Sequence, residues 1–347
     1  MNWGFIGCGS VTEIKSGPAY QQTTDFNVTA VMRRDIEKLK DYAKRHNIKA
    51  TFTDADALIN DANIDAVYIA TPPDTHKYYA LKVAKAGKPC CIEKPLSPSY
   101  NESLEIQKAF NEKNTPLFVA YYRRSLPRFL KIKEWLANNY IGEVRHINAH
   151  LSKPANDIDL AKGYNWRTDA KIAPAGYFDD LASHGLDLFT FLLGDIIDAK
   201  GISLNQQNLY TSKDAVTASW LHKKGVSGTG VWNFGCNDHL DLVIIYGNKG
   251  TIEFSVFHEK PIILKSATKN EELFIENPKH VQQYHVQNIS DFFQGKIDES
   301  NSSELRVNWD DTEDIGVVTH YKGKPLTGIG YSLYDNGRYN IVLLENF

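Results

Sequence analysis

Residues 2–12 read Asn-Trp-Gly-Phe-Ile-Gly-Cys-Gly-Ser-Val-Thr, a short apolar stretch that runs directly into a glycine-rich turn. This order is typical of the first strand, turn and helix of a dinucleotide-binding fold. Gly7 permits the tight turn, and Gly9 lets the backbone approach a pyrophosphate at the N-terminus of the next helix. Thr12 stands where the usual G-x-G-x-x-G pattern has its third glycine. Taken alone, the motif also fits an ordinary strand, turn and helix without a ligand.

Length and composition indicate a globular protein with room for two cored domains, since the chain has 347 residues and an apolar fraction of 42%. The net charge of −3 gives no reason to expect nucleic acid or a membrane as partner. The four cysteines form no C-x-x-C pair, which favours reduced thiols in a cytoplasmic protein. No signal segment and no long apolar run is expected from the sequence.

Apolar runs of buried parallel-strand type alternate with helical stretches in the first part of the chain. The runs are Val28–Met32, Ile64–Ala70, Lys88–Ile92 and Leu117–Ala120. They predict a doubly wound parallel sheet, in which ligands bind beyond the carboxyl ends of the strands. Polar residues stand at these ends: Thr71-Pro72, Glu93-Lys94-Pro95 and Tyr122-Arg123.

The cofactor preference is read from the end of the second predicted strand. An acidic residue there would bind the ribose 2′-hydroxyl of NAD, whereas an arginine accommodates the 2′-phosphate of NADP. The sequence has Arg33 and Arg34 at this place and no acidic residue before Asp35. Because guanidinium groups pair with phosphate and stack on adenine, we expect NADP to be preferred over NAD. A solvated basic pair that opens a surface helix is the alternative.

Several ordered motifs together resemble the Gfo/Idh/MocA oxidoreductases, the family of glucose-fructose oxidoreductase and inositol dehydrogenases. The motifs are Gly7-Cys8-Gly9, Ala70-Thr71-Pro72-Pro73 with His76, Glu93-Lys94-Pro95, Trp166-Arg167, Ala175-Gly176, Asp180 with His184 and Asp187, and Gly247 to Phe254. The resemblance implies an N-terminal Rossmann domain and a C-terminal α/β domain with a large open, mainly antiparallel sheet. We assign residues 1–121 to the first, 122–297 to the second, and 298–347 to an atypical tail.

The resemblance also implies the site residues. It makes Lys94, Asp180 and His184 the catalytic set, while His76 and Asp187 could each simply orient a neighbouring residue. On a helix, Asp180, His184 and Asp187 share one face, and a histidine beside a carboxylate moves protons near neutral pH. A capping aspartate and a structural histidine are the alternative. The expected cofactor-binding residues are Gly7, Gly9, Ser10, Val11, Arg33, Arg34, Thr71, Pro72, His76, Glu93, Lys94, Trp166 and Arg167, and the expected substrate-binding residues are Tyr122, Arg123, Asp180 and His184.

The function expected from these residues is hydride transfer between NAD(P) and a sugar, inositol or related polyol or carbonyl compound. Two alternatives stay open. One is an elimination of a glycosidic group on the same fold, and the other is a non-catalytic, cofactor-sensing regulator. No metal is expected, because the remaining histidines stand singly along the chain.

The second half of the chain has alternating β-branched runs that suit an antiparallel sheet. A sheet face with Trp220, Trp232 and Phe234 would bury against a second subunit or against its own helices. We expect a homo-oligomer, either a dimer or a tetramer. In the tail, His320–Gly328 and Tyr334–Gly337 resemble the hairpins of MORN-type repeats, and residues 298–303 form a polar break before them.

Overall fold

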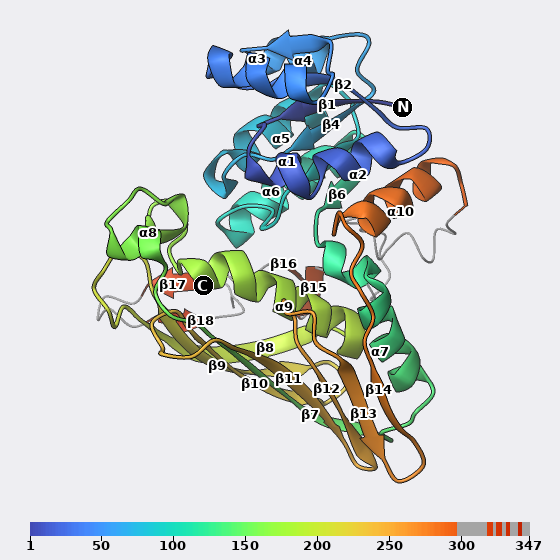
Figure 1. Cartoon of the computed structure of the whole chain (residues 1–347), viewed down its shortest axis with the longest axis vertical. Coiled ribbons are helices and arrows are strands. Elements are labelled where there is room, and N and C mark those ends of the chain that lie inside the picture. The colour runs from blue at the N-terminus through green and yellow to red at the C-terminus, as the bar shows by residue number, and fades with distance from the viewer. Residues whose placement is uncertain (297–317, 322–323, 328–330, 334–338, 342–347) are drawn as a thin grey trace. The chain divides into compact units, whose positions relative to one another are not determined.

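The computed structural model describes residues 1–296 and the backbone of four short strands beyond them (Figure 1). The chain forms two compact units. The first contains Met1–Ser125 and the described residues 278–296, and the second contains Leu126–Asn277 and the four later strands. The sequence placed residues 122–297 in one domain, whereas the structure groups the stretch from Pro278 with the first unit.

The first unit is built on a six-stranded sheet with the order β3-β2-β1-β4-β5-β6, and all its strand pairs are parallel. This is the order of a doubly wound dinucleotide-binding sheet, so the predicted fold class is confirmed. The strands are β1 (Asn2–Ile6), β2 (Asn27–Met32), β3 (Ala50–Phe52), β4 (Ala66–Ile69), β5 (Cys90–Ile92) and β6 (Leu117–Val119).

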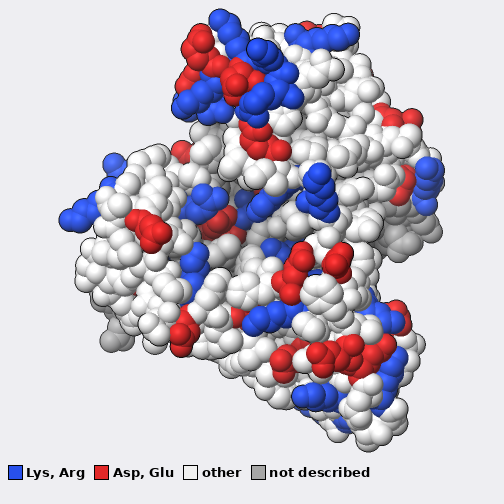
Figure 2. Space-filling model, in the orientation of Figure 1, with Lys and Arg blue, Asp and Glu red and all other residues white. Residues whose placement is uncertain are grey.

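The helices of this unit follow the strands, as the alternating pattern predicts. They are α1 (Ser10–Ile14), α2 (Gly17–Gln22), α3 (Ile36–Arg45), α4 (Ala55–Asn60), η1 (Pro73–Thr75), α5 (His76–Lys85), α6 (Tyr100–Glu112), η2 (Tyr122–Ser125) and α10 (Gln283–Phe293). Side chains cap several helices: Asp35 accepts from the Lys38 amide at 3.1 Å, and Asp54 accepts from the Ala57 amide at 3.1 Å. Figure 2 shows acidic and basic side chains intermingled over the region of α3.

The late helix α10 completes the hydrophobic core of the first unit. Val286 and Ile289 on this helix are fully buried, in one cluster with residues of β1, β4 and α2 such as Trp3, Tyr68 and Tyr20. Phe292 packs edge-on against Phe118 of β6, with ring centroids 5.5 Å apart. The first unit therefore draws its core from two distant parts of the chain.

The second unit is built on an eight-stranded sheet with the order β14-β13-β12-β11-β7-β10-β9-β8. Its pairs are antiparallel except for β10 and β7, which are parallel, so the predicted mainly antiparallel sheet is confirmed. The strands are β7 (Val144–Ser152), β8 (Ile196–Leu204), β9 (Ala215–His222), β10 (Ser227–Asn233), β11 (Leu240–Gly247), β12 (Gly250–Phe254), β13 (Ile262–Ser266) and β14 (Asn270–Leu273). The helices are α7 (Pro127–Ala137), α8 (Asp157–Leu160), η3 (Trp166–Thr168) and α9 (Tyr177–Leu193).

Helix α9 covers the inner face of this sheet (Figure 1). Its Phe178 packs edge-on against Trp232 with ring centroids 5.0 Å apart, and its Phe189 stacks on Trp220 at 5.9 Å. Both tryptophans and Phe234 are buried. Of the two interpretations open for these aromatic residues, the core against the chain's own helix is therefore the one that the structure supports.

The tail contributes two antiparallel hairpins, β15 (Val318–Tyr321) with β16 (Lys324–Thr327), and β17 (Tyr331–Leu333) with β18 (Tyr339–Ile341). The predicted polar break at 298–303 and the predicted hairpin unit Tyr334–Gly337 lie outside the described residues. None of the described helices is both long and apolar enough to cross a membrane.

Candidate functional site

The glycine-rich turn begins where β1 ends, and Gly7 is required there by the chain itself. Its φ of +93° is a conformation that residues with side chains rarely adopt. A Cβ atom at this position would lie 2.9 Å from the carbonyl oxygen of Ala70 and 2.9 Å from Cγ2 of Thr71. The turn therefore packs directly against the chain that follows β4.

Neither the backbone conformation nor the packing of the described chain requires a glycine at position 9. Its φ of −121° suits any residue, and among the described residues no atom lies within 4 Å of the position of a Cβ. The open space beside this backbone is what a pyrophosphate requires. Thr12, at the place of the third glycine, is fully buried and donates its hydroxyl to the Gly9 carbonyl at 2.9 Å. The residues of the turn thus fit a dinucleotide cofactor.

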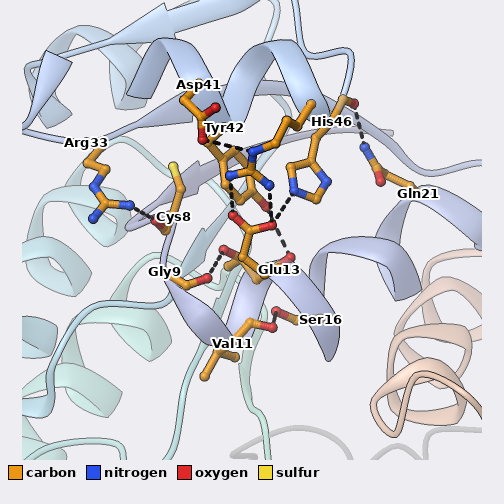
Figure 3. Close-up of polar contacts among 12 residues, drawn as sticks. Cys8, Gly9, Val11, Glu13, Ser16, Gln21, Arg33, Asp41, Tyr42 and His46 are labelled. Carbon is orange, nitrogen blue, oxygen red and sulfur yellow. Dashed lines mark hydrogen bonds and ion pairs between the residues drawn. The ribbon is translucent and has the colours of Figure 1, made fainter. Parts of the chain in front are cut away.

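A polar network fixes α1 beneath this turn (Figure 3). Glu13 accepts hydrogen bonds from both terminal nitrogens of Arg45, at 2.6 and 2.7 Å, and its Oε2 lies 2.7 Å from Nε2 of His46. Tyr42, also on α3, donates its hydroxyl to the Thr12 carbonyl at 3.1 Å. Together these contacts tie the short helix α1 to the much longer α3.

The two arginines after β2 are placed differently. Arg33 donates from Nη1 to the carbonyl oxygen of Cys8, so its guanidinium lies against the glycine-rich turn (Figure 3). Arg34 is exposed. Of the two arginines that the sequence singled out, Arg33 therefore lies beside the turn, and Arg34 faces solvent. Ser10 is exposed and Val11 half-buried at the start of α1.

His76 joins the loops that follow β4 and β5. Its ring is fully buried, with Nε2 2.8 Å from the Thr71 carbonyl oxygen and Nδ1 3.0 Å from that of Pro95. Burial lowers the pKa of this histidine, and the carbonyl contacts oppose that shift. His76 therefore positions Thr71 and the Lys94–Pro95 segment, the orienting role that the sequence left open for it.

Glu93 and Lys94 have different surroundings although they are neighbours. Glu93 is buried and accepts from the Tyr68 hydroxyl at 2.5 Å and from Nε2 of Gln282 at 2.7 Å. It thereby connects β4, β5 and the start of α10. Lys94 is half-buried and follows at the strand end, and the Lys94–Pro95 peptide bond is cis.

Tyr122 and Arg123 lie in η2, at the end of the first unit's N-terminal segment. Both side chains are buried, at 5% and 6% exposed, and Arg123 lies over the Tyr122 ring at 5.3 Å. Pro72 is exposed before η1. The predicted residues Gly7, Gly9, Arg33, Thr71, His76 and Lys94 thus all lie at or beside the strand ends of the first unit.

The remaining predicted residues belong to the second unit, on α9 and η3. Asp180 accepts from Nε of Arg167 at 2.6 Å, and the Arg167 guanidinium lies 4.3 Å from the centre of the Trp166 ring. His184 is buried one turn further along α9, edge-on to the ring of Phe257 at 6.0 Å. Asp187 is also buried. The structure thus joins Trp166 and Arg167 to the predicted Asp180.

The sequence did not single out the polar residues next to this group. Asp159 is buried and accepts from the Tyr177 hydroxyl at 2.5 Å, and Nδ2 of Asn165 donates to the same hydroxyl at 2.7 Å. Lys153 directly follows β7, with its ammonium 5.4 Å from the centre of the Tyr177 ring. The one signal for Lys153 in the sequence is that it follows the alternating β-branched run at residues 144–151. Within the described chain, no group of three His, Cys, Asp or Glu side chains is arranged to hold a metal ion.

Comparison with known proteins matches both units to one family. Residues 1–121 match the family described as "Oxidoreductase family, NAD-binding Rossmann fold" of the GFO/IDH/MocA group, and residues 129–253 match the GFO/IDH/MocA C-terminal domain. Oxidoreductase P35 of Formosa agariphila is 38% identical over 321 residues, which cover 92% of this chain and 96% of that protein.

Two further relatives have more specific names. A levoglucosan dehydrogenase of Pseudarthrobacter phenanthrenivorans is 26% identical over 54% of this chain and 44% of its own length. A solved levoglucosan dehydrogenase, in complex with NADH and levoglucosan, has the same fold with a TM-score of 0.74. It is 22% identical, and the match covers 85% of this chain and 90% of that one.

The Glu13 network leads to a prediction about stability and pH. We expect Glu13→Gln to lower the melting temperature at pH 7 by roughly 2–4 °C, the effect of losing about 1 kcal/mol. The Arg45 hydrogen bonds, above all, lower the pKa of Glu13 from its ordinary 4.5 to about 2. Since this pKa is lowered by folding, the stabilisation is complete above pH 4.5 and is lost as the pH falls through about 2.

Scanning calorimetry of both proteins between pH 7 and pH 3 measures this difference. The control is Glu37→Gln, since the Glu37 side chain on α3 is 81% exposed. Equal melting temperatures of the Glu13 variant and the unmutated protein at pH 7 would show that the network does not stabilise the first unit.

Proposed function

Since the chain belongs to the Gfo/Idh/MocA family of NAD-binding oxidoreductases, we propose that it is an NADP-preferring dehydrogenase or reductase of a sugar, inositol or related polyol. The observation that carries the proposal is the turn after β1, where Gly9 leaves open space that the protein's own packing does not require. When bound, a nicotinamide cofactor accepts or donates the hydride. Gly7, Gly9, Arg33 and Thr71 would hold it at the strand ends.

The proposed catalytic set is Lys94, Asp180 and His184. The Lys94 ammonium donates a hydrogen bond to the reacting hydroxyl or carbonyl oxygen, which favours the negative charge that develops there. His184 takes the hydroxyl proton in oxidation and returns it in reduction, because an imidazole nitrogen can both accept and donate a proton. Arg167 positions Asp180 through the 2.6 Å hydrogen bond.

The substrate class is supported by the relative named levoglucosan dehydrogenase. An elimination on the same fold and a cofactor-sensing regulator are the competing functions, and the tests below separate them. We also propose that the protein works in the cytoplasm, because its four cysteines are free thiols and three of them are buried.

The first test measures turnover of a panel of sugars and polyols with each nicotinamide cofactor. Lys94→Met and His184→Asn should each lower kcat by about 10²–10⁴-fold, since general acid–base groups contribute this much. Lys94→Met should leave cofactor affinity largely unchanged, and His184→Asn should remove one limb of the pH–rate profile. Near-normal turnover in both variants would refute the catalytic set. Cofactor binding without turnover of any substrate by the unmutated protein would favour the regulator.

The second test concerns the cofactor. NADPH should bind more tightly than NADH by about 10- to 100-fold, the value of one charge-assisted hydrogen bond. Arg33→Asp combined with Arg34→Ala should abolish this preference, and Arg34→Ala alone serves as the comparison because Arg34 is exposed. Titration followed by fluorescence gives the dissociation constants of NADPH and NADH for each of the three proteins. Equal affinities in the unmutated protein would overturn the preference for NADP.

We also propose that the protein forms a homo-oligomer. This proposal rests on the outward face of the large sheet, which is the face opposite α9. Charged residues make up 23% of the chain, yet the outward positions of four adjacent strands, β11, β7, β10 and β9, carry none. Charge depletion is typical of the centre of protein interfaces. These positions are His146, Asn148, His150, Ser152, Thr217, Ser219, Leu221, Ser227, Thr229, Val231, Asn233, Leu240, Leu242, Ile244 and Tyr246.

Charges stand at the two margins of this face and are complementary. Strand pairing sets up one row across the sheet that contains Asp198 on β8 and, near the opposite margin, Lys265 on β13. The next row contains Lys200 on β8 and, towards the opposite margin, Glu253 on β12. A two-fold axis parallel to the strands would place the β8 margin of one copy over the opposite margin of the other, so that unlike charges meet. We therefore propose a dimer formed by two such faces.

The dimer is tested by light scattering. Val231→Glu, in the middle of the face, should give monomers, whereas Leu130→Glu on α7 should not, although Leu130 is 46% exposed. Lys200→Glu should weaken the dimer, and adding Glu253→Lys should restore it. A monomeric unmutated protein, or a Val231→Glu variant that stays dimeric, would refute this interface.

A further inference from the structure

A hydrogen-bonded network surrounds the candidate catalytic Asp180 in the second unit. Its central residue is Asn165, which donates from Nδ2 to Tyr177 at 2.7 Å and to Asp159 at 3.2 Å. The Oδ1 of Asn165 accepts from the Arg167 backbone amide at 3.2 Å. Through these contacts the position of Arg167, and with it that of Asp180, depends on a rigid group of buried polar side chains.

The carboxylates of this network are already hydrogen-bonded within the protein. Asp159 accepts from Tyr177 at 2.5 Å, from Asn156 at 3.2 Å and from Asn165 at 3.2 Å. Asp180 accepts from Nε of Arg167 at 2.6 Å. The acidic groups therefore have donors, and the basic groups around them are the ones with capacity to bind a ligand.

Of these basic groups, Lys153 has the most unusual surroundings. It is half-buried at the end of β7, and among the described residues its ammonium makes no ion pair and no side-chain hydrogen bond. Burial lowers the pKa of Lys153, and the charge of Arg167 lowers it further, against the attraction of Asp159 and Asp180. An ammonium removed from water without a bonded partner is unfavourable.

Arg167 is the second basic group whose hydrogen-bond donors are available to a ligand. Its Nε–H is given to Asp180, while its two terminal amino groups have no hydrogen-bond partner in the described part of the chain. Lys153 and Arg167 lie close enough for their charges to repel. Burial lowers the pKa of the nearby His239, and the charges of His258 and Lys153 lower it further. An anion bound beside these groups would replace the lost hydration of the Lys153 ammonium, which a neutral hydroxyl does far less well.

We propose that Lys153, assisted by Arg167, binds a carboxylate of the substrate, so that the preferred substrate is a sugar acid rather than a neutral sugar. This inference rests on the proposed function. The substrate carboxylate would then lie next to Asp180, and the polyhydroxylated part of the substrate would contact the remaining site residues. Lys153 is thus a specificity-determining residue.

The test compares compounds that differ in one group. Calorimetric titration without cofactor measures the affinities of D-galacturonate and D-galactose, and of D-glucuronate and D-glucose. The acid should bind about 10- to 100-fold more tightly than its neutral partner, the value of one charge-assisted contact. Lys153→Met should remove this advantage, and Lys153→Arg should retain most of it.

Lys224→Met is the matched control, because Lys224 is exposed in the turn between β9 and β10. It should leave the preference for the acids unchanged. Equal affinity for acids and neutral sugars in the unmutated protein, or a preference that persists in Lys153→Met, would overturn the inference.

Turnover separates this inference from the function on which it rests. With each nicotinamide cofactor, the kcat/KM ratio of acid to neutral sugar should fall in Lys153→Met in parallel with the affinity ratio. Oxidation of neutral sugars without tighter binding of the acids would refute the carboxylate subsite and leave the dehydrogenase standing. Tight, Lys153-dependent binding of the acids without any turnover would support the subsite and refute the dehydrogenase.

Discussion

The burial of β1 between two parallel neighbours is the constraint on which the nucleotide half of the site depends. Because β1 pairs with β2 on one side and β4 on the other, the chain beyond Ile6 must turn at once. The amide of Gly7 donates to the Met32 carbonyl at 3.0 Å, so the turn is still tied to the end of β2. It also packs against Ala70 after β4. A turn held from both sides presents its backbone in a fixed place.

The second unit achieves the same rigidity with side chains. Helix α9 is anchored by aromatic stacking on the inner face of the sheet, through Phe178 and Phe189. Its first turns therefore hold Asp180 and His184 in fixed positions, and Asn165 and Tyr177 add a layer of hydrogen bonds behind Arg167. Preorganised polar groups of this kind need little rearrangement when a ligand binds.

Features that depend on near neighbours in the chain could be predicted from the sequence. The strand ends, the glycine-rich turn and the shared face of Asp180 and His184 follow from apolar runs and from helical spacing. Contacts between distant residues could not be predicted in this way. The bond from Gln282 to Glu93 joins residues 189 positions apart, and no local pattern marks it. Lys153 was missed for the same reason, since its environment is created by α9 and η3.

The late return of α10 to the first unit determines the order in which this protein is completed on the ribosome. The parallel sheet is translated first, but Phe118 remains without Phe292 and Phe293 until the whole second unit has been made. Until then, the part of the apolar face that α10 covers is exposed. Closure of the nucleotide-binding core is therefore one of the last events in the folding of the chain, and a prematurely terminated product would expose that face.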